Sequence, residues 1–227
     1  MEIDKNILVI SFLITTLIFL GVILIGFVFS EAREERVTQD MSSLLAELSD
    51  IQDIMLMSEV LGNEGLCEAF REVKTDMDEN LWELGMILDN YRIATEEFTE
   101  SEFYRENKVL FNRNQATYYF LFENIKDKCN QTQPTILFFY RDEEECDKCN
   151  DQSFVLGDVN DALDEDVSVF PFDFELDLLS INALANHYDV TEFPCTVIDG
   201  ESHCGIVRSK DFIINEICQN HDIEACN

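Results

Sequence analysis

An uninterrupted apolar run near the N-terminus places the strongest constraint on how this chain can fold. Residues 7–29, ILVISFLITTLIFLGVILIGFVF, contain no charged side chain over 23 positions. An α-helix rises about 1.5 Å per residue, so roughly 20 such residues cross the hydrocarbon core of a bilayer. The run therefore predicts a helix that spans a membrane.

A cleaved signal peptide is the alternative interpretation of this run. The segment Ser30–Ala32, just before Arg33, faintly resembles a small-residue cleavage site. The apolar part of a signal peptide is normally about 7–15 residues long, however, and this one is longer. We therefore expect residues 1–30 to be an uncleaved, single-pass anchor.

The flanking charges and the cysteines give opposite indications of orientation. Lys5 precedes the run and Arg33 and Arg36 follow it, which slightly disfavours export of the C-terminal part. Eight cysteines, an even number, favour an oxidising compartment instead. A sequon at Asn130 is compatible with export, although so short a pattern is common by chance. We expect the C-terminal part to be extracytoplasmic.

The formal charge of −32 is spread along the whole chain rather than gathered in one tail. Such a surface repels nucleic acids and anionic lipid headgroups and keeps the polar part of the chain dispersed. We therefore expect no nucleic-acid partner, and no sequence pattern points to a cofactor.

Residues 31–114 have helical periodicity and are expected to form a helical stalk or bundle. Two apolar stripes recur at helical spacing: Met41, Leu44, Leu45, Leu48, Ile51, Met55 and Met57, and then Leu66, Phe70, Val73, Met77, Leu81, Leu84, Leu88 and Tyr91. Gly62 and Gly65 predict a turn between them, and the sequence TESE (residues 99–102) predicts a capping box that opens a third helix. The stripes form either the core of a small bundle or a surface for a partner or a second copy.

Residues 115–227 have the pattern of an α/β domain built around one small sheet. The expected elements are strands at 134–140 and 167–176, a helix at 177–188, short strands at 195–198 and 203–207 on either side of a turn, and a final helix at 209–221 capped by Ser209. Pro171 within the second strand indicates a bulge or a sheet edge.

The cysteine pair in EEECDKCN (residues 143–150) can be interpreted from the elements that surround it. The order of a strand (TILFFY), the motif CDKC, a later x-Pro segment (HYDVTEFPCTVI), a hairpin and a final helix (CGIVRSKDFIINEI) resembles the thioredoxin-like superfamily. Pro194 follows Cys149 by 45 residues, which is close to the usual interval in that family. The resemblance covers roughly residues 115–221, and the first strand of the family is not recognisable.

The resemblance implies a fold and a set of roles. It implies a thioredoxin-like fold in the C-terminal half and a thiol–disulfide oxidoreductase that acts on cysteines of protein substrates. Cys146 would be the exposed nucleophile at a helix N-terminus, and Cys149 would be the resolving thiol. The Phe193–Pro194 bond would be cis and would bind the substrate backbone beside the pair.

Departures from the family pattern support a second interpretation. Glu145 replaces the usual aromatic residue before the first cysteine, and the loop between Tyr140 and Cys146 is about two residues longer. Phe138 occupies the position at which many relatives have a buried carboxylate. The acidic loop, the missing strand carboxylate and the long helical stalk favour an accessory subunit of a membrane complex that captures client cysteines without turnover. The oxidoreductase-type subunits of oligosaccharyltransferases are of this kind, but they carry several spans after the domain, whereas this chain has one before it.

A second cysteine pair is expected beside the first. A two-residue turn centred on Asp199 and Gly200 opposes Cys195 to Cys204, within reach of a disulfide that would staple the hairpin or, alternatively, relay electrons. A turn shifted by one residue would instead place Cys195 on the other face. The pairing of Cys67, Cys129, Cys218 and Cys226 stays open, with Cys218 and Cys226 as candidate partners of Cys129.

Other candidate sites are weaker. Cys146, Cys149, Cys195 and Cys204 match a zinc site in number but not in spacing, so no metal is expected, and a purely structural 146–149 disulfide is a further alternative. The histidines His187, His203 and His221 are expected at the surface, and Asp173 and Glu175 are expected to be solvated strand residues.

Overall fold

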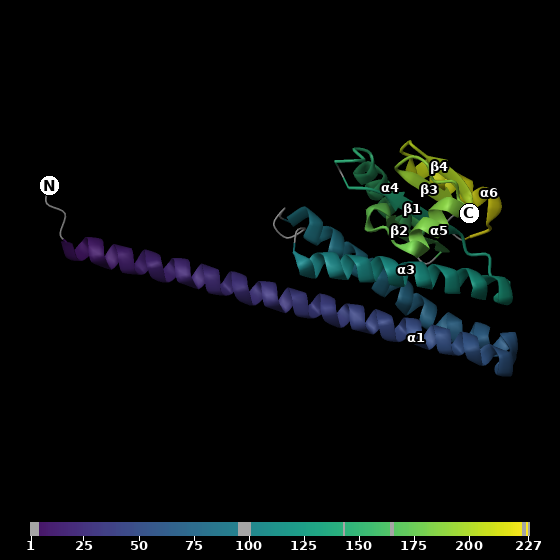
Figure 1. Cartoon of the computed structure of the whole chain (residues 1–227), viewed down its shortest axis with the longest axis horizontal. Helices are drawn as coiled ribbons and strands as arrows, with labels where there is room; N and C mark the ends of the chain where they lie inside the picture. Colours follow the sequence, from purple (N-terminus) through teal and green to yellow (C-terminus); the bar gives the residue numbers. More distant parts are fainter. Residues whose placement is uncertain (1–4, 95–100, 143, 164–165, 224–225, 227) are drawn as a thin grey trace. The chain divides into compact units, whose positions relative to one another are not determined.

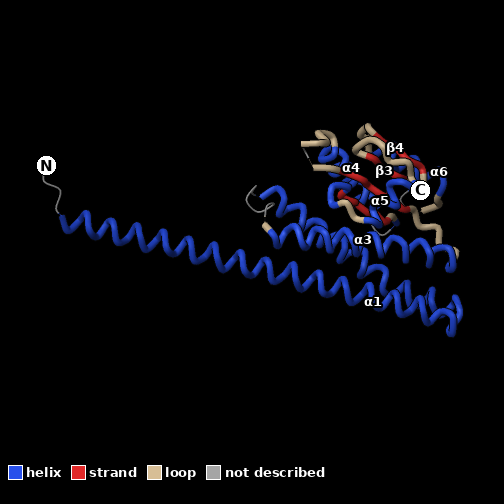
Figure 2. Tube along the Cα trace, in the orientation of Figure 1, coloured by secondary structure: helices blue, strands red, loops and turns tan. Residues whose placement is uncertain are grey.

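The structure is a computed structural model, and it describes the whole chain except residues 1–4, 95–100, 143, 164–165, 224–225 and 227. The described part is mostly helical, with a small mixed sheet in the C-terminal half (Figures 1 and 2). Residues 1–42 and 43–227 form two separate compact units, and helix α1 (Lys5–Ala94) begins in the first and continues into the second.

The N-terminal unit contains a helix that is long and apolar enough to span a membrane. Its apolar window, Val9–Gly26, has a mean hydropathy of 2.7 and none of its residues is buried within the protein. The hydroxyls of Thr15 and Thr16 donate to the carbonyl oxygens of Ser11 and Phe12, one turn earlier. Both hydroxyls are thus satisfied inside the helix itself, as a helix in a bilayer would need.

The second unit begins with a helical hairpin. Within α1, the backbone leaves the helical conformation at Gly62 (φ 77°, ψ 173°), where glycine lacks the Cβ that disfavours a positive φ. Asn80 on the second arm donates to Glu47 on the first (2.7 Å), so the two arms lie side by side. The turn expected from the glycines is therefore at Gly62, whereas Gly65 is helical.

The apolar stripe of the second arm is buried. Leu66, Phe70, Met77, Leu81, Leu84 and Leu88 are each at most 6% exposed. Phe70 packs on Phe122 of the next helix, with 6.0 Å between ring centroids, and the Cζ end of the Phe111 ring lies against Gly85. This stripe is part of a core, in agreement with the bundle interpretation and not with an open surface for a partner.

Helix α3 (Glu102–Cys129) joins this hairpin to the sheet. Its N-cap is Ser101, whose Oγ accepts a hydrogen bond from the backbone N–H of Tyr104. The expected capping box at residues 99–102, with its first residue as the cap, is therefore wrong. Thr99 itself lies outside the described residues. The helix runs through residues 114 and 115 without a break, and both residues belong to the unit of residues 43–227.

The sheet has four strands in the order β2-β1-β3-β4. Its strands are β1 (Thr135–Tyr140), β2 (Ser168–Asp173), β3 (Cys195–Ile198) and β4 (Glu201–Cys204). Strands β1 and β2 are parallel, and β3 is antiparallel to both β1 and β4. Pro171 lies on β2, an edge strand, where its missing N–H costs no ladder hydrogen bond with an outer neighbour.

Helices cover the sheet on both faces. Helices α4 (Cys149–Leu163) and α6 (Lys210–Asn220) pack on one face, where the core consists of Ile136, Phe138, Leu156, Val159, Leu163, Val167, Ile198, Ile213 and Ile217. Helices α3 and α5 (Leu179–His187) pack against each other, and Tyr118, Tyr119 and Phe122 of α3 surround Phe170 of β2. Ser209 caps α6 as expected, its Oγ accepting from the N–H of Phe212.

The β3–β4 hairpin has the register expected for a turn at Asp199 and Gly200. Both residues have positive φ (47° and 87°), as a two-residue hairpin turn of this kind needs. Thr196 faces His203 and Ile198 faces Glu201. Strand β4 therefore begins at Glu201, two residues before its expected start, and it ends at Cys204, so Gly205–Val207 are not part of it.

Candidate functional site

Cys146 and Cys149 lie in the connection between β1 and α4. The carbonyl oxygen of Asp142 accepts hydrogen bonds from the N–H groups of Glu145 (3.0 Å) and Cys146 (2.9 Å), which forms a tight turn. Helix α4 begins at Cys149, so Cys146 lies three residues before it. The two cysteines form a disulfide, with Cα atoms 5.4 Å apart.

Both sulfur-bearing residues are buried in this state. Cys146 is 5% exposed and Cys149 is 3% exposed. The expectation of an exposed Cys146 is therefore wrong for the disulfide form, because the turn folds its side chain against the protein.

The x-Pro segment directly precedes β3, the strand that pairs with β1. The Phe193–Pro194 peptide bond is cis, and Pro194 is buried directly before β3. Cys195, the first residue of β3, pairs with Phe139 near the end of β1. The N–H of Gly205 donates to the carbonyl oxygen of Pro194 (2.9 Å), which continues the β3–β4 pairing. The two predicted site segments thus emerge from the same end of two adjacent strands.

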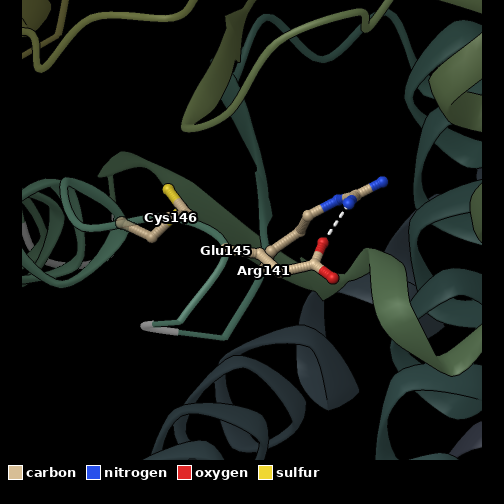
Figure 3. The surroundings of a disulfide bond; sticks show 4 residues. Arg141, Glu145 and Cys146 are labelled. Carbon is tan, nitrogen blue, oxygen red and sulfur yellow. Dashed lines mark hydrogen bonds and ion pairs between the residues drawn. A yellow bond between two sulfur atoms is a disulfide. The ribbon is translucent and has the colours of Figure 1, made fainter.

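Arg141 connects the two segments, a role that the sequence analysis did not assign. Its guanidinium group forms an ion pair with Glu145, and Figure 3 shows the side chain of Cys146 directed away from this pair. The guanidinium carbon lies 4.7 Å from the ring centroid of Phe193 and 5.3 Å from that of Phe174. The only basic residue between β1 and Cys146 could have been singled out in the sequence, but its aromatic partners could not.

Asp173 is buried, and the expectation of a solvated residue at this position is wrong. It is 1% exposed at the end of β2 and forms an ion pair with Lys108 of α3, which is itself buried. Its N–H donates to the side-chain oxygen of Asn112 (2.9 Å). Burial alone would lower the pKa of Lys108, but Tyr140, Asp173 and Tyr104 together raise it above its ordinary value. The lysine is therefore charged and compensates the buried carboxylate.

Glu175, which is exposed, has an altered acidity. Desolvation, a side-chain hydrogen bond with Asp142 and the negative charges of Asp142 and Asp173 raise the pKa of Glu175 to about 7. Its N–H donates to Asp173 (2.9 Å). A carboxyl group that titrates near neutral pH thus lies beside the turn that holds Cys146.

These charged groups line an open groove of about 1450 Å³. Its walls are the N-terminal half of α3, the loop after β1 and the 3₁₀ turn η2 (Phe174–Leu176) after β2. Because β1 and β2 are parallel, their carboxyl ends meet at this edge of the sheet, and the loop that carries Cys146 forms one wall.

The second expected pair also forms a disulfide. Cys195 and Cys204 face each other across β3 and β4, with Cα atoms 3.9 Å apart, and Cys195 is fully buried. The candidate pairing of Cys129 with Cys218 or Cys226, which the sequence left open, does not occur. Cys129 is bonded to Cys67, which fastens the end of α3 to the helical hairpin.

The last two cysteines and the three histidines are the remaining residues with an expectation from the sequence. Cys218 is bonded to Cys226, so all eight cysteines are paired, and the four cysteines of the zinc alternative lie in two disulfides. His187 is exposed and His221 contacts Asp199 (2.7 Å). His203, by contrast, is buried against Phe212 and is not a surface residue.

No protein-family model and no curated protein sequence matches this chain. The assignment of a function therefore depends on the geometry of the site.

Proposed function

We propose that this chain is a membrane-anchored thiol–disulfide exchange protein whose C-terminal half has a thioredoxin-like fold. The reacting couple is Cys146–Cys149, and its substrates are cysteines of other proteins. The Val9–Gly26 helix is the anchor, and the C-terminal unit lies outside the cytoplasm, where disulfides persist.

One observation carries the proposal. The C-x-x-C pair follows β1 and precedes α4, and the cis Phe193–Pro194 bond precedes the strand that pairs with β1. The sequence motif alone is common, but the two segments are 45 residues apart and meet at one end of the sheet. The order β1, α4, β2, α5, β3, β4, α6 around a β2-β1-β3-β4 sheet further supports the thioredoxin-like assignment.

The exchange reaction would proceed in two displacement steps. A client thiolate attacks the sulfur of Cys146, the Cys146–Cys149 bond breaks, and Cys149 takes the electron pair and then a proton. A second client thiolate attacks the client sulfur of the mixed disulfide and releases Cys146 as a thiolate. The client gains one disulfide and the couple becomes a dithiol, and the reverse sequence reduces a client.

The backbone around Pro194 would hold the client during this exchange. Phe193 is partly exposed and is braced by Arg141 and Phe174. An extended client segment would pair with the backbone of Phe193, as a short added strand, because the carbonyl oxygen of Pro194 already accepts the N–H of Gly205. Phe193 and Pro194 are therefore the proposed substrate-binding residues.

A second candidate function is an accessory module that captures client cysteines without turnover. Three observations favour it: Phe138 is packed in the core where a proton-accepting carboxylate would promote release, exposed acids surround the pair, and Cys146 is buried. The exposed Leu56, Met57 and Val60, near the turn of the helical hairpin, are the proposed contact of such a module with a membrane complex or a second copy.

The reduction potential of the couple tests the exchange proposal. The full chain in detergent is equilibrated with glutathione buffers, and labelling of Cys146 and Cys149 is measured by mass spectrometry. A potential between about −120 and −270 mV is expected for an exchange couple. A potential below about −300 mV would identify a structural disulfide and overturn the proposal.

Turnover separates the two candidate functions. With a reduced cysteine peptide and glutathione disulfide as the oxidant, an exchange enzyme produces many equivalents of peptide disulfide. A capture module stops after one mixed disulfide per chain. With an oxidised peptide disulfide as the client instead, Cys146 of the variant Cys149→Ser attacks the peptide disulfide and releases one peptide thiol, and the mixed disulfide should persist in both cases because the resolving thiol is missing, whereas Cys146→Ser should trap none.

Protease added to intact cells tests the orientation. Digestion of the C-terminal unit is expected if the anchor is inserted with its N-terminus inside. Protection of that unit in intact cells, with digestion after lysis, would show the opposite orientation.

A further inference from the structure

A glycosylation sequon follows the last turn of α3. Residues 130–132 are Asn-Gln-Thr, and nowhere else in the chain is an asparagine followed two positions later by serine or threonine. The thiol chemistry proposed above makes no use of this segment. A sequon can be modified in a folded protein only where its asparagine lies at the surface, so the local structure decides whether this one is an acceptor.

The sequon lies in a short connection between a helix and a strand. Asn130 ends α3 in the left-handed conformation (φ 50°, ψ 41°). The carbonyl oxygen of Lys126 accepts the N–H groups of Asn130 and of Gln131, the latter at 3.1 Å, so backbone bonds close the turn. Residues 131–134 have no regular secondary structure and lead directly to β1. The acceptor position is therefore on a surface turn, fixed by the end of the helix.

Both side chains that define the sequon are exposed. Asn130 and Thr132 are exposed, and Gln131 between them is half-buried. Among the described residues, no hydrogen bond engages the amide of Asn130 or the hydroxyl of Thr132. A sugar on the Asn130 amide nitrogen and an enzyme contact to the Thr132 hydroxyl would thus displace no hydrogen bond of these two side chains.

The conformation of Asn130 has a structural explanation of its own. After glycine, asparagine is a common residue at the left-handed end of a helix. That explanation does not extend to Thr132, which lies two residues beyond the helix end and has no capping role. The exposed threonine at this spacing from an exposed asparagine is what points to glycosylation.

The sequon lies in the same unit as the cysteines. All four disulfides belong to residues 43–227, and Cys129, directly before Asn130, is bonded to Cys67. Disulfides persist in the secretory and extracellular compartments, and asparagine-linked glycans are a feature of secreted proteins. The two features are therefore compatible with one location outside the cytoplasm.

We propose that Asn130 carries an asparagine-linked glycan, transferred from a lipid-linked oligosaccharide. The amide nitrogen of Asn130 forms a bond to the anomeric carbon of the first sugar. The bond between that carbon and the lipid phosphate oxygen breaks, and the phosphate leaves with the electron pair. The nitrogen gives up one proton to a base of the transferase, so no oxidant or reductant is needed. The inference rests on the extracytoplasmic location in the function proposed above, but not on thiol exchange.

The glycan would project from the end of the sheet opposite to the cysteine pair. Asn130 precedes β1, whereas Cys146 and Cys149 follow it. The Phe193–Pro194 segment precedes β3, which is antiparallel to β1, so this segment lies at the same end as the pair. A bulky, hydrophilic glycan at Asn130 therefore leaves the proposed exchange site open and increases the solubility of the unit.

Peptide mapping tests the site directly. The full chain is expressed in a eukaryotic host, whose secretory pathway contains such a transferase. The purified protein is treated with a glycan amidase in water labelled with heavy oxygen, which introduces the label at each asparagine that carried a glycan. After reduction, alkylation and digestion with trypsin, residues 129–141 form one peptide whose only asparagine is Asn130. Incorporation of the label into this peptide is the expected result.

Two variants at Thr132 separate the sequon from nonspecific deamidation. Thr132→Ala leaves Asn130 and its turn in place but removes the hydroxyl, so the label should be lost. Thr132→Ser keeps a hydroxyl and should keep the label. Because Thr132 is exposed, both variants should unfold at the temperature of the wild type. Equal labelling of the wild type and Thr132→Ala would overturn the proposal.

The end of α5 provides a matched positive control. Asp189 is exposed and has φ 52°, the carbonyl oxygen of Ala185 accepts the N–H of Val190 (2.9 Å), and Thr191 is exposed. The variant Asp189→Asn therefore creates a second sequon in a similar turn. Its occupancy is measured as an additional shift in electrophoretic mobility that the amidase removes. Glycans at both positions would support the proposal.

The two negative results have different meanings. A glycan at position 189 without one at Asn130 would overturn the assignment of Asn130 and leave the extracytoplasmic location intact. The absence of a glycan at both positions would overturn the proposal together with that location. Thiol exchange is decided separately, by the reduction potential of the Cys146–Cys149 couple.

Discussion

The guanidinium carbon of Arg141 lies 4.7 Å from the ring centroid of Phe193, the residue that forms the cis peptide bond with Pro194. The same guanidinium contacts Phe174 and Glu145. One side chain therefore joins the loop that carries Cys146 to the segment that we propose binds the client. Its planar group stacks on rings in a way that an ammonium group does not reproduce.

Replacement of Arg141 should loosen this junction. We expect Arg141→Lys, which keeps the charge, to cost about 0.5–1 kcal/mol, and Arg141→Ala to cost about 1–2 kcal/mol, because cation–π and ion-pair contacts at partly exposed sites have these sizes. Thermal unfolding of the full chain in detergent measures both. Arg105→Ala, at an exposed position on α3, is the control and should change stability by less than about 0.5 kcal/mol. Equal stability of Arg141→Lys and the wild type would contradict the stacking role.

The helical hairpin should respond to a substitution according to burial. Leu84 is 1% exposed and Met86, two positions along the same helix, is 46% exposed. Leu84→Asp places a carboxylate in the bundle core and should cost more than about 3 kcal/mol. Met86→Asp should be nearly neutral. The fluorescence of Trp82, the only tryptophan, reports unfolding of this region. If Leu84→Asp left the unfolding temperature unchanged but released a co-purifying protein, the stripe would be an interface after all.

The two disulfides outside the candidate site should differ in their contribution to the free energy of unfolding. Cys67 and Cys129 are 62 positions apart, whereas Cys218 and Cys226 are 8 apart. On the chain-entropy account, removal of the first bond costs about 4 kcal/mol and removal of the second about 2.5 kcal/mol. Paired Cys→Ser variants measure these values by thermal unfolding. The opposite ranking would show that Cys67–Cys129 is not formed or is compensated by the bundle.

Two glycines should respond in opposite directions to alanine. Gly205 has φ 77°, a Cβ there would meet the flexible carboxylate of Glu192, and its N–H is bonded to Pro194. Gly205→Ala should cost about 1–2 kcal/mol, mainly through the backbone conformation. Gly157 lies inside α4 with open space around its Cα, so Gly157→Ala should stabilise by about 0.5–1 kcal/mol. Thermal unfolding of both variants checks the pair, and a stabilised Gly205→Ala would refute the strained turn.

Features that depend only on neighbouring residues could be predicted from the sequence. The apolar run from Ile7 to Phe29 predicts its helix because length and composition alone decide whether a segment can span a bilayer. The turn at Asp199 and Gly200 fixes the register of the hairpin because a two-residue loop leaves no freedom in pairing, and Cys195 therefore faces Cys204. The cap of α6 at Ser209 is likewise a local hydrogen bond.

Contacts between residues far apart in the sequence were known only from the folded chain. Periodicity shows which face of a helix is apolar but not what covers it, so the burial of Leu84 and the Cys67–Cys129 bond were not predictable. The expectation for Asp173 failed for the same reason, since its partner, Lys108, is 65 positions earlier on another element. The chemistry of the candidate site depends on such contacts because burial and charge at one position are set by side chains that the fold brings from elsewhere.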